Sequence, residues 1–329
     1  MINLREELTH IADAIRRKHD IDLPIAPSAF ADLIDDIPTG SDPYEFFNTT
    51  SSTAGASNTG AACNLLIKKF PATTLNPSSC TYLMAYMRAL VDASLVTIPG
   101  TKSNYAYAFY YCDNLRKLPS INWNGATNQQ CIFYYCSSLT QQDLHDAGFS
   151  SAKATALSSS FRNMLALTEV DGDYCGIKMT ANTSLNYTFY QSYNITKMIN
   201  MGSTAKVTNW GLAFYGLQVM TTMQELDGTG ATNVTQAFYN CRSLRDFGGF
   251  YNLGAAYTTT QAASYSSYTL DFTQSTILTH DSLMNIINKL YDIKAKGCKA
   301  QKLVLGSTNT AKLTAAEIAI ATNKGWTVS

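Results

Sequence analysis

The stretch "AFYYCDNLRKL", residues 108–118, decides the fold because five variants of it follow along the chain. They are "IFYYCSSLTQQ" at 132–142, "SFRNMLALTEV" at 160–170, "TFYQSYNITKM" at 188–198, "AFYGLQVMTTM" at 213–223 and "AFYNCRSLRDF" at 237–247. Each has a phenylalanine at its second position, and successive phenylalanines are 24, 28, 28, 25 and 24 residues apart. One frame recurring at such a period indicates a repeat protein.

The frame also fixes which positions are apolar. Small or apolar residues stand three positions after each phenylalanine, and apolar residues stand six and nine positions after it, except for Gln142 at one ninth position. One unit cannot bury such a face alone, so neighbouring units stack and share a core. We expect that core to contain Phe109, Cys112, Leu115, Phe133, Cys136, Leu139, Phe161, Phe189, Phe214, Phe238, Cys241 and Leu244. A degenerate earlier copy is expected at 89–98, with Leu95 and Ile98 at its last two positions.

Tyrosine dominates the position directly after each phenylalanine, which reads Tyr110, Tyr134, Arg162, Tyr190, Tyr215 and Tyr239. These rings could stack on one another with hydroxyls bonded to backbone groups in the turns. They could instead face a ligand. The next position is mixed and is expected to face solvent without forming a ladder: Tyr111, Tyr135, Asn163, Gln191, Gly216 and Asn240.

The pattern AF-x-x-C-x-x-L-x-x-apolar resembles the BspA-like leucine-rich repeat of bacterial surface antigens and of phage and prophage proteins. The resemblance covers residues 80–260; Met164, Ser192 and Leu217 depart from it at the cysteine, and the usual proline survives only at Pro99 and Pro119. It implies a short helical turn at each phenylalanine and parallel short strands near each leucine. The residue eight after each phenylalanine would then point outward, as a recognition surface or a solvated sheet face: Lys117, Gln141, Glu169, Lys197, Thr222 and Asp246.

The expected fold is therefore an α+β repeat solenoid of BspA-like leucine-rich repeats, with an N-terminal helical hairpin and an α/β C-terminal cap. The hairpin occupies 1–37, and its "IADAIRRK…IAPSAFADLIDDI" resembles the N-terminal segment of prophage tail-associated proteins. We expect it to pack against a sister chain or a larger assembly, or else to cap the repeats. Residues 38–79 are a Ser/Thr-rich linker and entry, 80–260 the repeats, and 261–329 the capping region. In the cap we expect strands at 268–272 and 302–306, a helix at 280–296, and a second helix starting at the capping box "TAAE", 314–317.

Composition and charge narrow the function. Lys and Arg number 24 against 24 Asp and Glu, without the basic clusters on which phosphate-backbone binding depends, so nucleic acid is not expected. The sequence contains no run of about 18 apolar residues, so membrane insertion is not expected. The charged N-terminus lacks the apolar segment of a signal peptide, so we expect synthesis in the host cytoplasm without secretion. The eight cysteines contain no CxxC pair and are best interpreted as buried free thiols, ahead of a zinc site or disulfide framework.

No catalytic pattern stands out. There is no GxSxG, HExxH or phosphate-binding glycine loop, and the four histidines lie in different regions, so we expect neither an enzyme nor a cofactor. His280 and Asp281 open a helix and are interpreted as capping residues. Asp171 and Asp173 form an acidic turn with too few oxygen ligands for a calcium loop, so no metal is expected.

The leading hypothesis is a bacteriophage virion tail protein: a fibre, a tip component or a receptor-binding adhesin. Residues 1–37 would contact other tail proteins, and the repeats would contact host glycan or protein, with avidity from a homo-oligomer, expected to be a trimer. The candidate binding residues are Tyr110, Tyr134, Tyr190, Tyr215, Tyr239, Lys117 and Lys197. One alternative is a bacterial BspA-like surface adhesin, which would carry a signal peptide. Another is a polysaccharide hydrolase that depends on Glu169 or Asp171.

Overall fold

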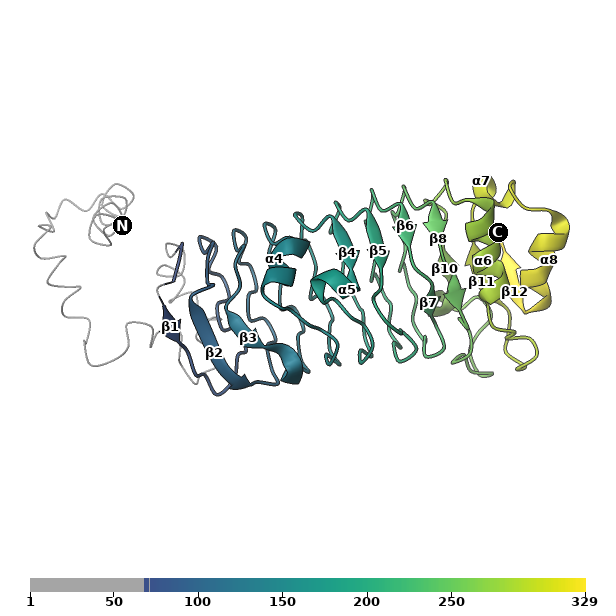
Figure 1. Ribbon diagram of the computed structural model, residues 1–329. Coiled ribbons are helices and arrows are strands. Elements are labelled where there is room, and N and C mark those ends of the chain that lie inside the picture. The colour runs from purple at the N-terminus through teal and green to yellow at the C-terminus, as the bar shows by residue number, and fades with distance from the viewer. Residues whose placement is uncertain (1–67, 71) are drawn as a thin grey trace, which may run out of the picture. The chain divides into compact units, whose positions relative to one another are not determined.

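The computed structural model describes residues 68–70 and 72–329. In these residues the chain winds through successive coils that lie side by side (Figure 1). The predicted hairpin at 1–37, most of the predicted linker, and Cys63 lie outside the described residues.

Within the described residues, every strand pairs in parallel with one or two neighbouring strands. A first sheet joins β1 (Thr73–Thr74), β2 (Val96–Thr101) and β3 (Ser120–Asn122). A second joins β4 (Glu169–Asp171), β5 (Lys197–Ile199), β6 (Thr222–Met223) and β8 (Asp246–Phe247), and β7 (Leu226–Asp227) pairs with β9 (Phe250–Tyr251). In the second sheet Glu169, Lys197, Thr222 and Asp246 stand opposite one another, so the position eight after each phenylalanine forms one row across the coils.

Each phenylalanine lies in consecutive tight turns, not in the helical turn that the family resemblance implies. The residues two before and two after it have positive φ, for example Tyr107 at 59° and Tyr111 at 58°. Between them, hydrogen bonds alternate: Phe109 N donates to Ile132 O of the next coil, while Tyr110 N donates to Tyr107 O within its own turn. A helix would keep all these donors within one coil. The left-handed residues instead direct alternate N–H groups to the neighbouring coil.

Side-chain ladders reinforce this stacking. Six residues before the phenylalanine stands a threonine whose hydroxyl donates to the carbonyl of the same position one coil earlier, at 3.0–3.3 Å, in the series Thr127, Thr155, Thr183, Thr208 and Thr232. One position later, a second row of parallel bridges links Asn104, Asn128, Ala156, Ser184, Asn209 and Asn233. The asparagine side chains in this row accept from the backbone N–H two residues on and so start the turn. These threonines therefore join adjacent coils, and these asparagines shape the turn within each coil.

The core is a ladder of phenylalanine rings. Phe109, Phe133, Phe161, Phe189, Phe214 and Phe238 are each at most 1% exposed, and neighbouring centroids are 5.3–6.2 Å apart. Leu115, Leu139 and Leu244, each six residues after a phenylalanine, are fully buried. Burial of these side chains away from water stabilises the stack.

The cysteine position holds a small hydrogen-bond donor in four of the six copies and an apolar side chain, Met164 or Leu217, in the other two. Cys112, Cys136 and Cys241 are fully buried, and Cys136 Sγ donates to Phe109 O of the preceding coil at 3.0 Å. Ser192 replaces cysteine and makes the same kind of bond, from Oγ to Phe161 O at 2.7 Å. Burial raises the pKa of these thiols, to about 12 for Cys241, so they remain protonated donors. No disulfide joins the cysteines of the described residues.

The earlier degenerate copy lies at 84–93 and not, as predicted, at 89–98. Met84 takes the phenylalanine position, and Met87, Leu90 and Ala93 follow as fully buried residues. Leu95, predicted to be buried, is 46% exposed. Asp92, eight residues after Met84, forms a parallel β-bridge with Lys117, which stands eight residues after Phe109. The observed copy is shifted from the predicted one because methionine, Met84, fills the position that phenylalanine holds in the other copies.

One further copy follows Phe238. Phe272 stacks on Phe238 at 5.1 Å, and Ser275 and Leu278 are buried three and six residues later. The Gln142 exception also has a structural reason. Helix α4 (Gln141–Asp146) replaces the strand of its coil, so Gln142 is exposed and Leu144 fills the core instead.

The C-terminal elements are α6 (His280–Lys289), α7 (Ser307–Thr310), α8 (Ala315–Asn323) and a parallel sheet of β10 (Leu270–Asp271), β11 (Gln301–Val304) and β12 (Trp326–Val328). The predicted capping box is present: Thr314 and Glu317 bond reciprocally at the start of α8. Helix α6 ends seven residues before the predicted end, because Leu290 turns to extended backbone. Shorter helical elements are η2 (Trp123–Gly125), α5 (Gly172–Cys175) and η3 (Ser266–Tyr268).

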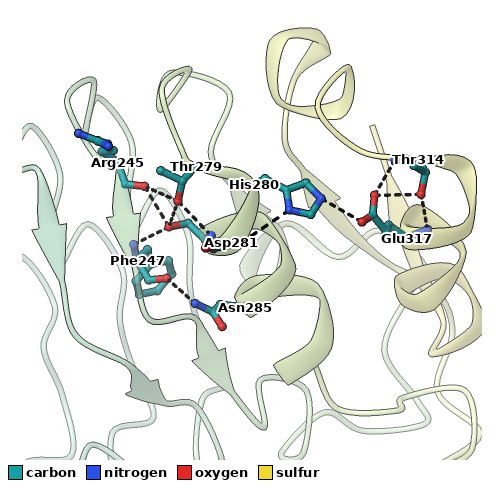
Figure 2. A network of polar contacts seen from close by, with 9 residues as sticks. Arg245, Phe247, Thr279, His280, Asp281, Asn285, Thr314 and Glu317 are labelled. Atoms are coloured by element: carbon teal, nitrogen blue, oxygen red, sulfur yellow. Dashed lines mark hydrogen bonds and ion pairs between the residues drawn. The ribbon is translucent and has the colours of Figure 1, made fainter.

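Figure 2 shows how α6 covers β8, the last strand of the second sheet. In earlier coils the next strand pairs with this position. Here Ser282 Oγ accepts from Phe247 N at 2.9 Å, and Asn285 Nδ2 donates to Phe247 O at 3.4 Å. Side chains of a helix thus satisfy backbone groups that would otherwise form an open sheet edge. No helix of the described residues is long and apolar enough to cross a bilayer.

Candidate binding surface

The residues after the phenylalanines form one continuous row of π contacts. Tyr110 and Tyr134 stack at 4.8 Å, Tyr190 and Tyr215 at 4.7 Å, and Tyr215 and Tyr239 at 5.2 Å, with interplanar angles of 16–25°. Arg162 fills the gap between Tyr134 and Tyr190. We call Tyr110, Tyr134, Arg162, Tyr190, Tyr215 and Tyr239 the tyrosine row. All six side chains are half-buried.

Stacking determines what the row can offer to a ligand. A ring between two neighbours has both faces covered, so its edge and phenol oxygen are what a ligand can reach. Burial raises the pKa of Tyr110, Tyr134 and Tyr215, and the phenols remain neutral donors and acceptors at neutral pH. The row is therefore suited to hydrogen bonding more than to stacking of a sugar on a ring face.

The second tyrosine position was predicted to form no ladder, and for the first coils this is wrong. Tyr86, Tyr111 and Tyr135 stack in sequence, at 5.7 and 4.6 Å and within 10° of parallel. The reason is that these residues share the same left-handed backbone conformation in adjacent coils, which aligns their side chains. Beyond Tyr135 the series continues with Asn163 and is no longer aromatic.

A third pair completes a broad aromatic surface. Tyr82 and Tyr107 stack at 4.7 Å, and Tyr110 contacts both Tyr107 and Tyr111 edge to face. The seven rings that we call the tyrosine face are Tyr82, Tyr86, Tyr107, Tyr110, Tyr111, Tyr134 and Tyr135. Sequence reasoning found the row but not this two-dimensional cluster, since the residue two before each phenylalanine is tyrosine in few copies.

The candidate lysines belong to a different row, where they pair with carboxylates of adjacent coils. Lys117 Nζ lies 4.0 Å from an Asp92 oxygen, and Lys69 Nζ lies 3.5 Å from the same carboxylate. Lys197 Nζ lies 3.3 Å from Glu169. These pairs are solvent-exposed, where such bonds contribute little to stability. The charges of Lys117 and Lys197 are therefore already paired with carboxylates of the neighbouring coil.

The side chains of the acidic turn, Asp171 and Asp173, bond to other groups of the protein. Asp171 caps α5, accepting from Asp173 N at 3.0 Å, and also accepts from Asn200 Nδ2. Asp173 pairs with Lys178. The Asn200 amide, together with the backbone N–H groups of α5, lowers the pKa of Asp171. Across residues 68–70 and 72–329, no three His, Cys, Asp or Glu side chains are grouped to hold a metal ion.

The two described histidines contact carboxylates at helix ends. His280, predicted to cap α6, is its first residue, and Thr279 is the cap, accepting from Ser282 N. His280 Nε2 lies 2.9 Å from Glu317 Oε1 and joins α6 to α8 (Figure 2). His145 stacks on Tyr174 at 4.3 Å between α4 and α5. Both rings are solvent-exposed, and neither has a nucleophile bonded to it.

A small pocket of about 380 Å³ lies at the C-terminal end, lined in part by Lys294, Cys298 and Trp326. It adjoins neither the tyrosine face nor a group of titratable side chains suited to catalysis. No family model matches the sequence, and no similar protein is found among curated sequences or solved structures. The aromatic surface is therefore the candidate site that the geometry itself distinguishes.

Proposed function

We propose that this chain is a binding protein of a bacteriophage tail that contacts the host cell surface through its repeats. The observation that carries the proposal is the tyrosine face together with the tyrosine row: aligned, half-buried phenols in successive coils, with Arg162 in place of one tyrosine. The family resemblance of the repeats and of the N-terminal segment supports the tail assignment, and residues 1–37 would contact other tail proteins.

The chemistry favours a surface glycan as the ligand. Phenols at regular spacing can each donate and accept one hydrogen bond, and a polysaccharide carries hydroxyls at regular spacing too. Each contact is weak because solvent competes for it. Several copies acting together commonly raise avidity by about 10²–10⁴, which is the reason to propose a homo-oligomer, and for a tail appendage a trimer.

A glycan hydrolase is the less favoured candidate. A general acid needs a carboxyl group whose pKa is raised. Asp171 has a lowered pKa because Asn200 and the start of α5 stabilise its charged form, and Glu169 pairs with Lys197. The BspA-like cellular adhesin shares the proposed surface and differs in location, so it is separated from the tail protein by finding the chain in purified virions.

The test is binding of purified protein to intact cells of candidate hosts. Tyr110→Phe/Tyr134→Phe removes two phenol oxygens and keeps the stacked rings, so folding is preserved. The matched control is Tyr251→Phe, which removes the same oxygen at an exposed tyrosine on β9. We expect the double variant to bind cells at least tenfold more weakly and the control to bind as wild type. Equal binding by all three proteins would remove the tyrosines from the site, and no wild-type binding to any host would indicate a purely structural role.

A further inference from the structure

Arg162 is the one cation in the tyrosine row, and aromatic rings surround it. Its guanidinium carbon lies 4.4 Å from the ring centroid of Tyr190, 5.0 Å from Tyr134 and 5.2 Å from Tyr187. These are cation–π distances, which hold the planar group in place. The residue therefore has a defined orientation despite its long side chain.

No described carboxylate pairs with this charge. Within the described part of the chain, no carboxylate lies within ion-pair distance of Arg162, and its guanidinium donates no hydrogen bond to another residue; Nε is buried without a partner. Arg88 provides the comparison: it also lies over a tyrosine ring, at 5.1 Å from Tyr111, but it pairs with Asp113 at 3.6 Å. The Nη groups of Arg162 are therefore left without a hydrogen-bond partner among the described residues, whereas Nε is buried and out of reach of a ligand.

Packing alone does not require arginine here. Tyrosine occupies the same position in the other five of the six copies from Phe109 to Phe238 and stacks well on its neighbours. Arginine at this site gives up a ring–ring stack and introduces an unpaired charge into a half-buried row. A guanidinium fork offers what the phenols lack, namely parallel donors that match a carboxylate or a phosphate.

We propose that Arg162, with the phenols of Tyr134, Tyr187 and Tyr190, binds an anionic group of a surface polysaccharide. The inference rests on the proposed function and names its ligand class. The anion is the carboxylate of an acidic sugar or the phosphodiester of a polyol-phosphate polymer, which present the same paired oxygens. Because the rings fix the guanidinium in advance, little conformational freedom is lost on binding.

The test measures direct binding of the full chain to three soluble polymers by calorimetry. Oligogalacturonate carries carboxylates, poly(glycerol phosphate) carries phosphodiesters, and dextran is neutral. We expect wild type to bind at least one of the two anionic polymers, with affinity falling as salt rises, and to bind dextran at least tenfold more weakly. The anionic polymer that binds identifies the source of the group.

Two substitutions separate the site from general charge. Arg162→Tyr restores the residue found in the other copies, so it keeps the row intact and removes the anion-binding fork. Arg242→Tyr is the matched control: it removes the same charge at an exposed position, four residues after Phe238, where another copy carries Tyr193. We expect Arg162→Tyr to lose at least tenfold in affinity for the anionic polymer and Arg242→Tyr to bind within twofold of wild type. Thermal unfolding verifies that both variants are folded.

Equal loss in both variants, no loss in Arg162→Tyr, or no anionic binding by wild type would each overturn the inference. The proposed function has its own readout in the cell-binding assay. If Arg162→Tyr still binds host cells as wild type, the anionic site is wrong while the adhesin proposal stands. If wild type binds the anionic polymer but no cells, the adhesin proposal is wrong while the anionic site stands.

Discussion

Ser192 offers a sharp test of how adjacent coils are joined. Its side chain is fully buried, Oγ donates to Phe161 O at 2.7 Å, and Oγ accepts from Met164 N at 3.1 Å. Ser192→Ala removes one oxygen and opens almost no cavity, but it leaves a buried carbonyl and a buried N–H unpaired. An unsatisfied buried group costs about 1–3 kcal/mol, so the variant should lose about 2–4 kcal/mol of unfolding free energy.

Two matched variants isolate the hydrogen bonds. Ser192→Cys places at this position the residue of Cys112, Cys136 and Cys241, whose thiols donate to the preceding coil, and it should lose clearly less than Ser192→Ala. Ser203→Ala removes an exposed hydroxyl and should change stability by less than about 0.5 kcal/mol.

The assay is urea unfolding followed by tryptophan fluorescence, with circular dichroism as a second probe of the same transition. If Ser192→Ala unfolds at the wild-type midpoint, the donor at this position does not stabilise the stack. The choice of cysteine or serine there would then be only a matter of size.

Two further predictions concern glycine and pH. Gly148 and Gly176 both have positive φ, but an added Cβ would meet nothing at Gly148 and would collide with Phe149 O at Gly176. Thermal melts should therefore show that Gly148→Ala lowers the free energy of unfolding by about 1–2 kcal/mol and that Gly176→Ala lowers it clearly more. Equal losses would refute the clash. Hydrogen bonds from the N–H and the hydroxyl of Thr314, and then from His280, lower the pKa of Glu317 below its ordinary 4.5. The ionised Glu317 therefore stabilises α8 fully above pH 4.5, and this stabilisation is lost as the pH falls through the lowered pKa of the folded state. Hydrogen exchange of α8 amides between pH 7 and pH 3 should show this loss in wild type and a flatter profile in Glu317→Gln, and identical profiles would contradict it.

The repeating frame and the burial of its anchors could be inferred from the sequence, because apolar side chains that recur at a fixed spacing line up on one shared face, which water disfavours. Phe189 and Leu244 are buried for this reason. The same logic failed at Met84, where a flexible apolar side chain fills an aromatic site, and at Gln142, where a helix replaces a strand. A pattern of residue types records which surface is buried but not which local backbone buries it.

Only part of the candidate site could be predicted from the sequence. The row from Tyr110 to Tyr239 could be predicted by position, while the two interpretations of it, stacking or ligand contact, could not be separated. The lateral contacts that join Tyr107, Tyr110 and Tyr111 depend on left-handed backbone at alternating positions, which residue type does not predict for tyrosine.

The sequence by itself determined the period and most of the apolar anchors, whereas Asn163, predicted to face solvent, is buried. Tertiary structure alone decided that Arg162 lies among three rings without a carboxylate partner among the described residues, whereas Lys117 and Lys197 are paired. The physical reason is distance. Burial follows from the spacing of residues within one coil, but the partner of a charge is set by residues one coil away, about 24–28 positions along the chain.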